Sequence, residues 1–231
     1  MVFPYKMFKR AAVIVLTLMF SATAKAETHY QPHISVGAHA GMVISRLSFS
    51  PEVPQSWYLG PTMGVQIRYA EEKLVGVMAE LNFTNRGWKE TFEDSPELSY
   101  SRSMSYFTLP IMTHICFGSP RVKCFFNLGP EFGYMVSSNI SSNFDYRNPG
   151  GLLPATRRVN QMSMEIKNKF DYGITGGVGA EFYISPRNSV YIEGRYYFGL
   201  GNIFPSSKAD EFSASRTMTI AVTAGYNFRL K

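Results

Sequence analysis

Long apolar runs are missing from almost all of this chain. After residue 26, no stretch reaches the roughly 18 consecutive apolar residues that a membrane-spanning helix requires, so a helical membrane protein is excluded. Charged residues are also few, at 17% of the sequence, whereas aromatic residues reach 15%. With 231 residues, this composition favours one folded domain.

Cysteine and histidine are scarce as well, with two cysteines and four histidines in the whole chain. Cys116 and Cys124 are close in sequence and could form a disulfide in an oxidising compartment. The alternation described below points them to opposite faces of a sheet, so free thiols are favoured over a bridge. The cysteines and histidines show no metal-ligand spacing, and we predict no metal centre.

The clearest apolar run lies at the N-terminus. Residues 1–26 combine the basic residues Lys6, Lys9 and Arg10 with an apolar segment at 11–20 and small residues at 22–26. This arrangement predicts a secretory signal peptide, because the apolar segment is too short to remain as a membrane anchor. We expect cleavage between Ala26 and Glu27, with a site after Ala24 as the alternative. No cysteine follows either site, which disfavours a lipoprotein.

Removal of the signal peptide changes the charge of the protein. The intact chain carries a formal net charge of +6, and residues 1–26 contain four basic residues and no acidic ones, which leaves +2 on the mature chain. A charge so close to neutral gives little support for binding to a polyanion. We therefore predict no nucleic-acid partner.

Alternation with a period of two dominates the remaining sequence. Between His33 and Ser45, apolar side chains from Ile34 to Ile44 occupy one face, and mostly Gly, Ser and His occupy the other. This pattern predicts a β-strand. It recurs in seven further segments, at 57–69, 75–84, 107–115, 123–136, 170–182, 190–200 and 217–228.

The connections between these segments alternate in length. Short connections at 70–73, 117–122 and 184–188 alternate with long ones at 46–56, 89–101, 137–169 and 201–215. Transmembrane barrels of the outer membrane have short periplasmic turns, longer extracellular loops and an even number of strands. The sequence therefore predicts an all-β fold, a transmembrane antiparallel up-and-down β-barrel of about eight strands, with both termini in the periplasm.

A soluble β-barrel or sandwich is the alternative, because its strands also alternate. Its second face would be rich in surface charge and poor in glycine, whereas here that face holds Gly, Ser, Thr, Asn and a few opposite charges, as in a narrow filled lumen. Aromatic residues near the strand ends fit the two interfacial girdles of a membrane barrel. They are Trp57, Tyr69, Trp88, Tyr134, Phe170, Phe182, Tyr196 and Phe228.

Four segments of the chain resemble the PorT-like outer-membrane β-barrel family. They are Tyr106–Ile111, Asn127–Tyr134, Gly173–Phe182 and Arg195–Ile203, and the last is the most similar. The resemblance extends over nearly all of the mature chain. It implies a single integral outer-membrane barrel domain over 27–231, and the family's namesake belongs to the type IX (Por) protein secretion system.

Charged and polar groups on the inner face are the candidate site residues. They are Arg68, Glu80, His114, Lys123, Glu131, Asp171, Glu181, Glu193 and Arg195. Such a mixture is compatible with paired catalytic acids or an ion pathway. The interior of an eight-stranded barrel is only just wide enough for side chains, so buried charges must pair. We predict a structural network in which Glu193 and Arg195 join Glu181 and Glu80.

These observations lead to a non-enzymatic function without a cofactor. No arrangement of Ser, His and an acid is recognisable, which leaves an outer-membrane lipid-modifying enzyme as a weak alternative. The leading hypothesis is a scaffold or docking component of the cell envelope, in contact with outer-membrane lipid and with envelope or secretion-system proteins. An adhesin that binds ligand through the loop 137–169 is the alternative, and a small pore is a third possibility that the narrow lumen disfavours.

Overall fold

The computed structural model describes residues 32–70, 74–154, 157, 159–205 and 212–230. Its strands are β1 (His33–Ser50), β2 (Gln55–Ser56), β3 (Tyr58–Ala70), β4 (Val75–Glu90), β5 (Tyr100–Gly118), β6 (Val122–Ser142), β7 (Phe170–Tyr183), β8 (Asn188–Gly199) and β9 (Ala214–Arg229). Two short helices, η1 (Gly150–Leu152) and α2 (Asn160–Ser163), lie between β6 and β7. No helix in these ranges is long and apolar enough to cross a membrane.

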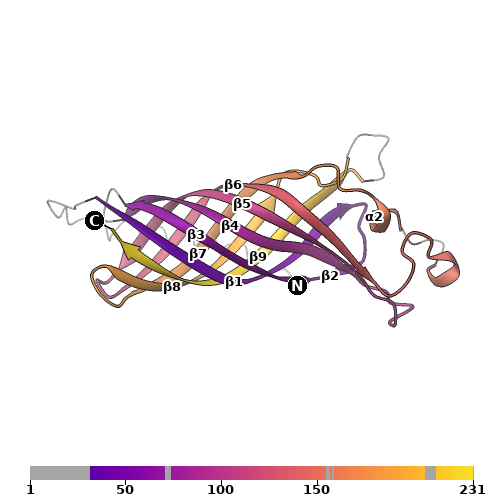
Figure 1. Ribbon diagram of the computed structural model, residues 1–231, viewed down its shortest axis with the longest axis horizontal. Helices are drawn as coiled ribbons and strands as arrows, with labels where there is room; N and C mark the ends of the chain where they lie inside the picture. Colours follow the sequence, from indigo (N-terminus) through magenta and orange to yellow (C-terminus); the bar gives the residue numbers. More distant parts are fainter. Residues whose placement is uncertain (1–31, 71–73, 155–156, 158, 206–211, 231) are drawn as a thin grey trace, which may run out of the picture. The chain divides into compact units, whose positions relative to one another are not determined.

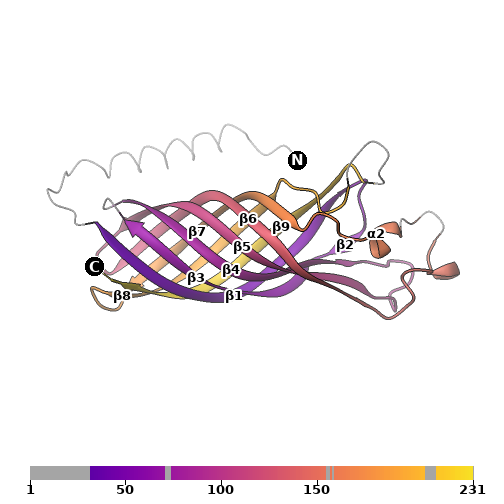
Figure 2. The same ribbon diagram turned by 45° about the horizontal axis from the view of Figure 1, so that its top comes forward.

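Eight of the strands form a closed antiparallel ring. Each pairs with its neighbour along the chain, and the ring closes between β1 and β9, which stay in register from Ser35 opposite Arg229 to Ser50 opposite Ala214. The two-residue β2 pairs with the end of β4 beside β3. Figure 1 and Figure 2 show the tilted strands, with the short turns and the C-terminus at the left and the long loops at the right. The predicted up-and-down barrel is confirmed.

Two sequence predictions lie outside the described residues: the signal peptide with its cleavage site at Ala26 and Glu27, and the turn residues 71–73. The prediction for the cysteines is confirmed, because no disulfide joins Cys116 and Cys124. Cys124 is exposed on the outside of the barrel, whereas Cys116 is half-buried. Phe117, the outward neighbour of Cys116, is the residue that lies opposite Cys124 in the sheet, which accounts for the missing bridge.

An apolar belt surrounds the barrel, and the polar side chains point inward. On β8, Ile192 is 52% exposed while its neighbour Glu193 is 2% exposed. The same contrast separates Leu81 from Glu80 on β4. A soluble barrel would bury the apolar face, so that alternative is wrong. On β5 the belt runs from Phe107 to Phe117. At about 3.3 Å per residue and a tilt of about 40°, this segment spans roughly 25 Å along the barrel axis. The apolar band of outer-membrane barrels has about the same height.

The polarity of the two faces reverses where the strands leave the belt toward the long loops. On β5 the outward residues change from Phe107 to Ser105 and Ser103, while the inward residues change to Tyr106 and Met104, both fully buried. β1 and β4 show the same reversal, with Leu47, Phe49 and Trp88 inside. Above the belt the barrel is therefore built like a soluble protein, with polar residues outside and an apolar core within.

This reversal explains why several strands are longer than the sequence predicted. β1 reaches Ser50 instead of 45, β4 reaches Glu90 instead of 84, and β5 begins at Tyr100 instead of 107. The sequence prediction assumed that apolar residues stay on the same face along a whole strand. It therefore ended each strand where the apolar residues move to the other face. The backbone pairing continues because the hydrogen bonds of a sheet do not depend on which face is apolar.

The boundary of the belt gives a testable difference between two outward positions. We expect Ile192→Arg to lower the free energy of unfolding by about 2–4 kcal/mol, because the new cation would face the middle of the bilayer. Ser103→Arg places the same side chain outward but above the belt, and we expect a loss below about 1 kcal/mol. Urea unfolding of the barrel in lipid vesicles measures both, and equal losses would contradict the assigned belt.

Candidate functional site

The lumen near the short turns is filled by a charge cluster around Glu181. The guanidinium of Arg68 lies 2.8 Å from the Glu181 carboxylate. Ser189 Oγ and Asn227 Nδ2 donate to the other carboxylate oxygen at 2.5 and 3.1 Å. Arg68 and Glu181 are each almost completely buried, so every oxygen of this acid has a partner inside the barrel.

A second cluster, around Arg195, occupies the middle of the lumen. Arg195 donates to both oxygens of Glu80 at 2.6 and 2.8 Å and to Glu193 at 2.7 Å. Side-chain amides form further hydrogen bonds to the two carboxylates, since Asn82 donates to Glu80 and Asn127 donates to Glu193, each at 2.9 Å. One arginine from β8 is thus shared by acids from β4 and β8.

Uncharged groups extend the cluster around Glu181. The hydroxyl of Tyr191 donates to Gln66 at 3.0 Å, and Gln66 donates to Asn227 at 2.5 Å. Asn227 in turn contacts Glu181. The polar interior thus contains hydrogen-bonded clusters, and a cavity of about 30 Å³, on the order of a single water molecule, lies beside Arg86 and Arg195.

A third cluster, around Arg86, lies at the top of the belt and was not predicted. Arg86 forms an ion pair with Glu131 and lies 3.6 Å from Asp171. The ring of Tyr197 is 4.3 Å from its guanidinium carbon. Arg86 continues the inward series of Glu80, but the predicted strand stopped at residue 84. Extending the period of two by one step would have found it.

The structure places the nine predicted residues in different surroundings. Seven of them lie in the three clusters: Arg68, Glu80, Glu131, Asp171, Glu181, Glu193 and Arg195. His114 is buried with its Nδ1 2.7 Å from Asn127. Lys123 stands over the ring of Tyr183 at 5.2 Å and forms no ion pair with the described residues. Glu80 and Glu193 share Arg195, as the predicted network has them. Glu181 pairs with Arg68 in a separate cluster, so its predicted place in the Arg195 network is wrong.

Glycines on the inner face make room for the long side chains opposite them. A Cβ atom on Gly177 would lie 2.3 Å from Glu193 Oε1, and one on Gly179 would lie 2.3 Å from the ring of Phe125. Both distances are far below van der Waals contact. These glycines therefore leave the space in the lumen that the side chains opposite them occupy. Strand β8 follows β7, so no helix comes directly after these glycines to bind a phosphate group.

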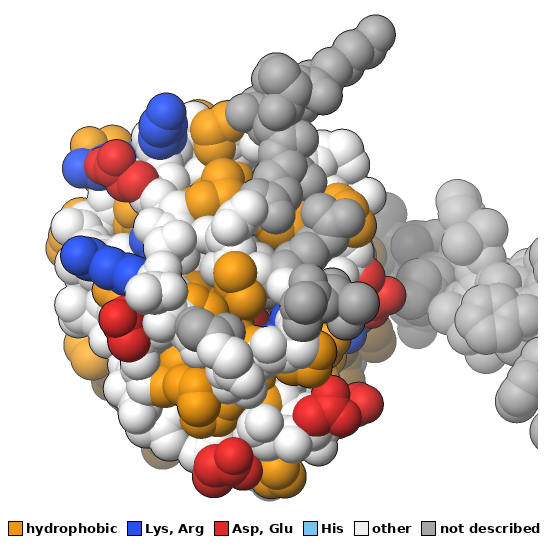
Figure 3. Space-filling model, turned by 90° about the vertical axis from the view of Figure 1, so that its right-hand side faces the viewer, with side chains coloured by type: hydrophobic (Ala, Val, Ile, Leu, Met, Phe, Trp, Pro, Cys, Tyr) orange, Lys and Arg blue, Asp and Glu red, His pale blue; other side chains and the backbone are white. Residues whose placement is uncertain are grey.

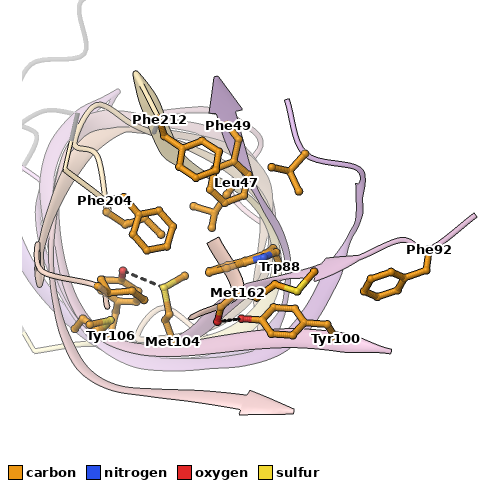
Figure 4. Close-up of a cluster of buried hydrophobic side chains, with 14 of the residues drawn as sticks. Leu47, Phe49, Trp88, Phe92, Tyr100, Met104, Tyr106, Met162, Phe204 and Phe212 are labelled. Atoms are coloured by element: carbon orange, nitrogen blue, oxygen red, sulfur yellow. Dashed lines mark hydrogen bonds between the residues drawn. The ribbon is translucent and has the colours of Figure 1, made fainter. Parts of the chain in front are cut away.

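Above Arg86 the barrel is closed by an apolar core, which we call the cap. Trp88 is completely buried in it, against Phe49 at 5.8 Å and Phe204 at 6.3 Å between ring centroids. Figure 4 shows these rings filling the end of the barrel from several strands and loops. The cap consists of Leu47, Phe49, Val53, Trp88, Phe92, Tyr100, Met104, Tyr106, Met135, Leu153, Met162, Ile166, Ile203, Phe204 and Phe212.

The assignment of Trp88 to an interfacial girdle is therefore wrong. Trp88 follows Arg86 on the inward face of β4, above the belt where the inner face is apolar. The other seven predicted girdle residues are exposed on the outer face. The reversal of polarity explains the difference, because an inward aromatic residue above the belt packs into the cap.

Buried polar contacts attach the connection between β6 and β7 to the cap. The hydroxyl of Tyr100 donates to the Met162 carbonyl at 2.8 Å, and Arg102 donates to the Met164 carbonyl at 2.6 Å. Glu90 accepts from Gln161 at 3.0 Å and from Arg157 at 3.2 Å. Glu90 lies beyond the belt, and burial raises the pKa of its carboxyl. The connection is thus held at several points.

The interior offers little for catalysis. Among the residues that the structure describes, no group of three His, Cys, Asp or Glu side chains could hold a metal ion. His39 and His114 are buried in the lumen, where their partners are acids and amides of the network. The ion pairs of the lumen link side chains from different strands of the barrel.

Comparisons with known proteins agree with this architecture. Residues 26–205 match the family model described as the outer membrane protein beta-barrel domain. The comparison with curated proteins gives no match. Solved structures include OprG from Pseudomonas aeruginosa, with 8% identity, a TM-score of 0.48 and coverage of 87% of this chain and 97% of that one.

Two further barrels are similar at the same level. Neisserial surface protein A (NspA) has 11% identity and a TM-score of 0.47, with 86% of this chain and 99% of that one covered. Ail, the attachment invasion locus protein of Yersinia pestis, has 14% identity and a TM-score of 0.39, with 85% of this chain and 99% of that one covered. The family match covers most of the sequence, and the chain therefore belongs to the outer-membrane β-barrel domain family as an integral protein of the outer membrane.

Proposed function

We propose that this protein is a closed barrel that docks other proteins at the cell surface through its long-loop end. In this proposal the long loops are extracellular and both termini are periplasmic, as the alternation of short and long connections favours. The observation that carries the proposal is the double closure of the lumen. The charge network fills the belt, and the cap seals the end from which the loops project.

The cap also keeps the loops that would bind a partner in an ordered conformation. Loops that are already ordered lose less conformational entropy when a partner binds. The contacts of Tyr100 and Arg102 with the β6–β7 connection provide such order. Figure 3 shows acidic, basic and apolar side chains mixed over this end of the molecule. A mixed surface favours a protein partner over a polyanion, which would require a field of one sign.

Two narrower functions stay hypotheses. Participation in type IX secretion would follow from the PorT-like resemblance, but the matching family model is the general barrel domain. An adhesin would use the same loop end for a host ligand, and it differs from an envelope docking component only in the identity of the partner. A small pore is disfavoured by the filled lumen.

A single-cysteine experiment on intact cells tests orientation and docking together. In a background with Cys116→Ser and Cys124→Ser, we expect a membrane-impermeant, thiol-reactive crosslinker to react with Ser95→Cys, in the β4–β5 loop, and to join it to one discrete protein. Ser119→Cys, in the β5–β6 turn, should stay unlabelled. Both sites are turns outside the belt, which makes them a matched pair.

Each alternative predicts a different result. Labelling of Ser119→Cys but not of Ser95→Cys would invert the orientation. Labelling of Ser95→Cys without any crosslinked protein would contradict docking at this loop. Ion conductance by the wild-type barrel in planar bilayers would show an open lumen and support the pore. We expect none, because the network and the cap leave no continuous passage.

A further inference from the structure

A basic and aromatic patch lies on the outer face where the belt ends. On β1 the outward side chain changes from Ile44 to Arg46, and on β9 it changes from Met218 to Arg216. Trp57, which directly precedes β3, is outward and exposed beside them. These residues are at the depth where the apolar band of the membrane gives way to the headgroups.

The register of the sheet brings the three side chains of this patch together. Arg46 lies opposite Met218, and Arg216 lies opposite Ser48, so the two arginines are diagonal neighbours on one face of the β1–β9 pair. Diagonal neighbours are about 7–8 Å apart, within reach of a shared ligand for side chains of this length. The guanidinium carbon of Arg46 is 4.9 Å from the ring centre of Trp57. Stacking on the ring holds this cation near the barrel wall.

Neither arginine of the patch is neutralised within the described part of the protein. Arg46 and Arg216 have no ion pair and no side-chain hydrogen bond with described residues, and the Nε atom of Arg216 is buried without a partner. The arginines of the lumen behave differently, since Arg68, Arg86 and Arg195 each contact an acid. These two cations, which have no acidic partner among the described residues, are therefore available to an anion at the edge of the belt.

We propose that Arg46, Arg216 and Trp57 bind the phosphate group of a lipid in the adjacent leaflet. Guanidinium groups bind phosphate oxygens through paired, charge-assisted hydrogen bonds. The acyl chains of the same lipid would lie on Ile44, Met218 and Leu59, directly below the patch in the belt. The ligand is thus a phosphorylated amphiphile, and with the long loops outside it is a phosphorylated glycolipid such as lipid A.

Binding of lipid A to the refolded full-length mature barrel in neutral detergent tests this site, and native mass spectrometry provides the readout. We expect the wild-type barrel to retain lipid A and to bind the same lipid without its phosphates far more weakly. Each cation near a membrane surface contributes roughly fivefold to anionic-lipid binding, so Arg46→Gln with Arg216→Gln should weaken it by about tenfold or more. Arg121→Gln with Arg187→Gln, exposed at the short-turn end, is the matched control and should bind like wild type.

Three results would overturn the site. Unchanged binding by the Arg46 and Arg216 double variant would show that these cations are not the ligands. Equal binding of phosphorylated and dephosphorylated lipid would reduce the interaction to apolar contact. Displacement of lipid A by millimolar inorganic phosphate would identify a general anion site. The assay is done in detergent and needs no protein partner, so its failure is separate from a failure of surface docking.

Discussion

Replacing Arg195 with methionine is expected to lower the free energy of unfolding by about 3–5 kcal/mol, because two buried acids would lose their shared cation. Arg195 contacts Glu80 and Glu193 at 2.6 to 2.8 Å, and both acids are 2% exposed. Both carboxylates are shielded from bulk solvent, which therefore cannot solvate them in place of the arginine. Urea unfolding of the barrel in lipid vesicles measures the loss.

A second substitution identifies the partner. Adding Glu80→Gln to Arg195→Met should recover part of the stability, since one stranded charge is removed while the amide can still accept from Asn82. Glu181→Gln should not recover it, because Glu181 belongs to the Arg68 cluster. Lys123→Met is the control for loss of an inward cation without an ion pair, and we expect less than about 1 kcal/mol. Normal stability of Arg195→Met together with lost surface binding would contradict the structural role of the network.

Truncation of the cap at Trp88 is expected to have an effect of similar size. Trp88→Ala should lower the free energy of unfolding by about 3–5 kcal/mol, because it removes a fully buried ring and leaves a cavity among rings held by several loops. Trp57→Ala is the matched control, since these are the only two tryptophans in the chain and Trp57 is 44% exposed. We expect a loss below about 1 kcal/mol there.

Unfolding of both tryptophan variants in lipid vesicles, followed by circular dichroism, compares the two sites directly. A second readout is the susceptibility of the loop end to protease, which should rise in Trp88→Ala because the β6–β7 connection rests on the cap. Equal stability of the two variants would mean that the cap does not support the barrel. Greater loss in Trp57→Ala would place the essential aromatic contacts at the lipid interface instead.

Alternation of apolar and polar residues was enough to determine the fold class from the sequence. A period of two fixes which residues share a face, and Ile192 and Glu193 therefore point in opposite directions in any strand that contains them. The number of alternating segments gave the number of strands, and the lengths of the connections gave their antiparallel order. The inward position of most network residues followed from the same period, because it is a local property of the strand.

Only the tertiary structure decided the pairing of charges and the position of the membrane boundary. Glu181 meets Arg68 across the lumen, and Arg195 meets Glu80, because closure of the ring and the stagger of the strands bring distant residues to one level. The local pattern contains no such information. The inward Trp88 is a second example. Apolar residues of a strand point outward where lipid surrounds the barrel and inward where water surrounds it. The sequence alone does not show at which residue the surroundings change from lipid to water.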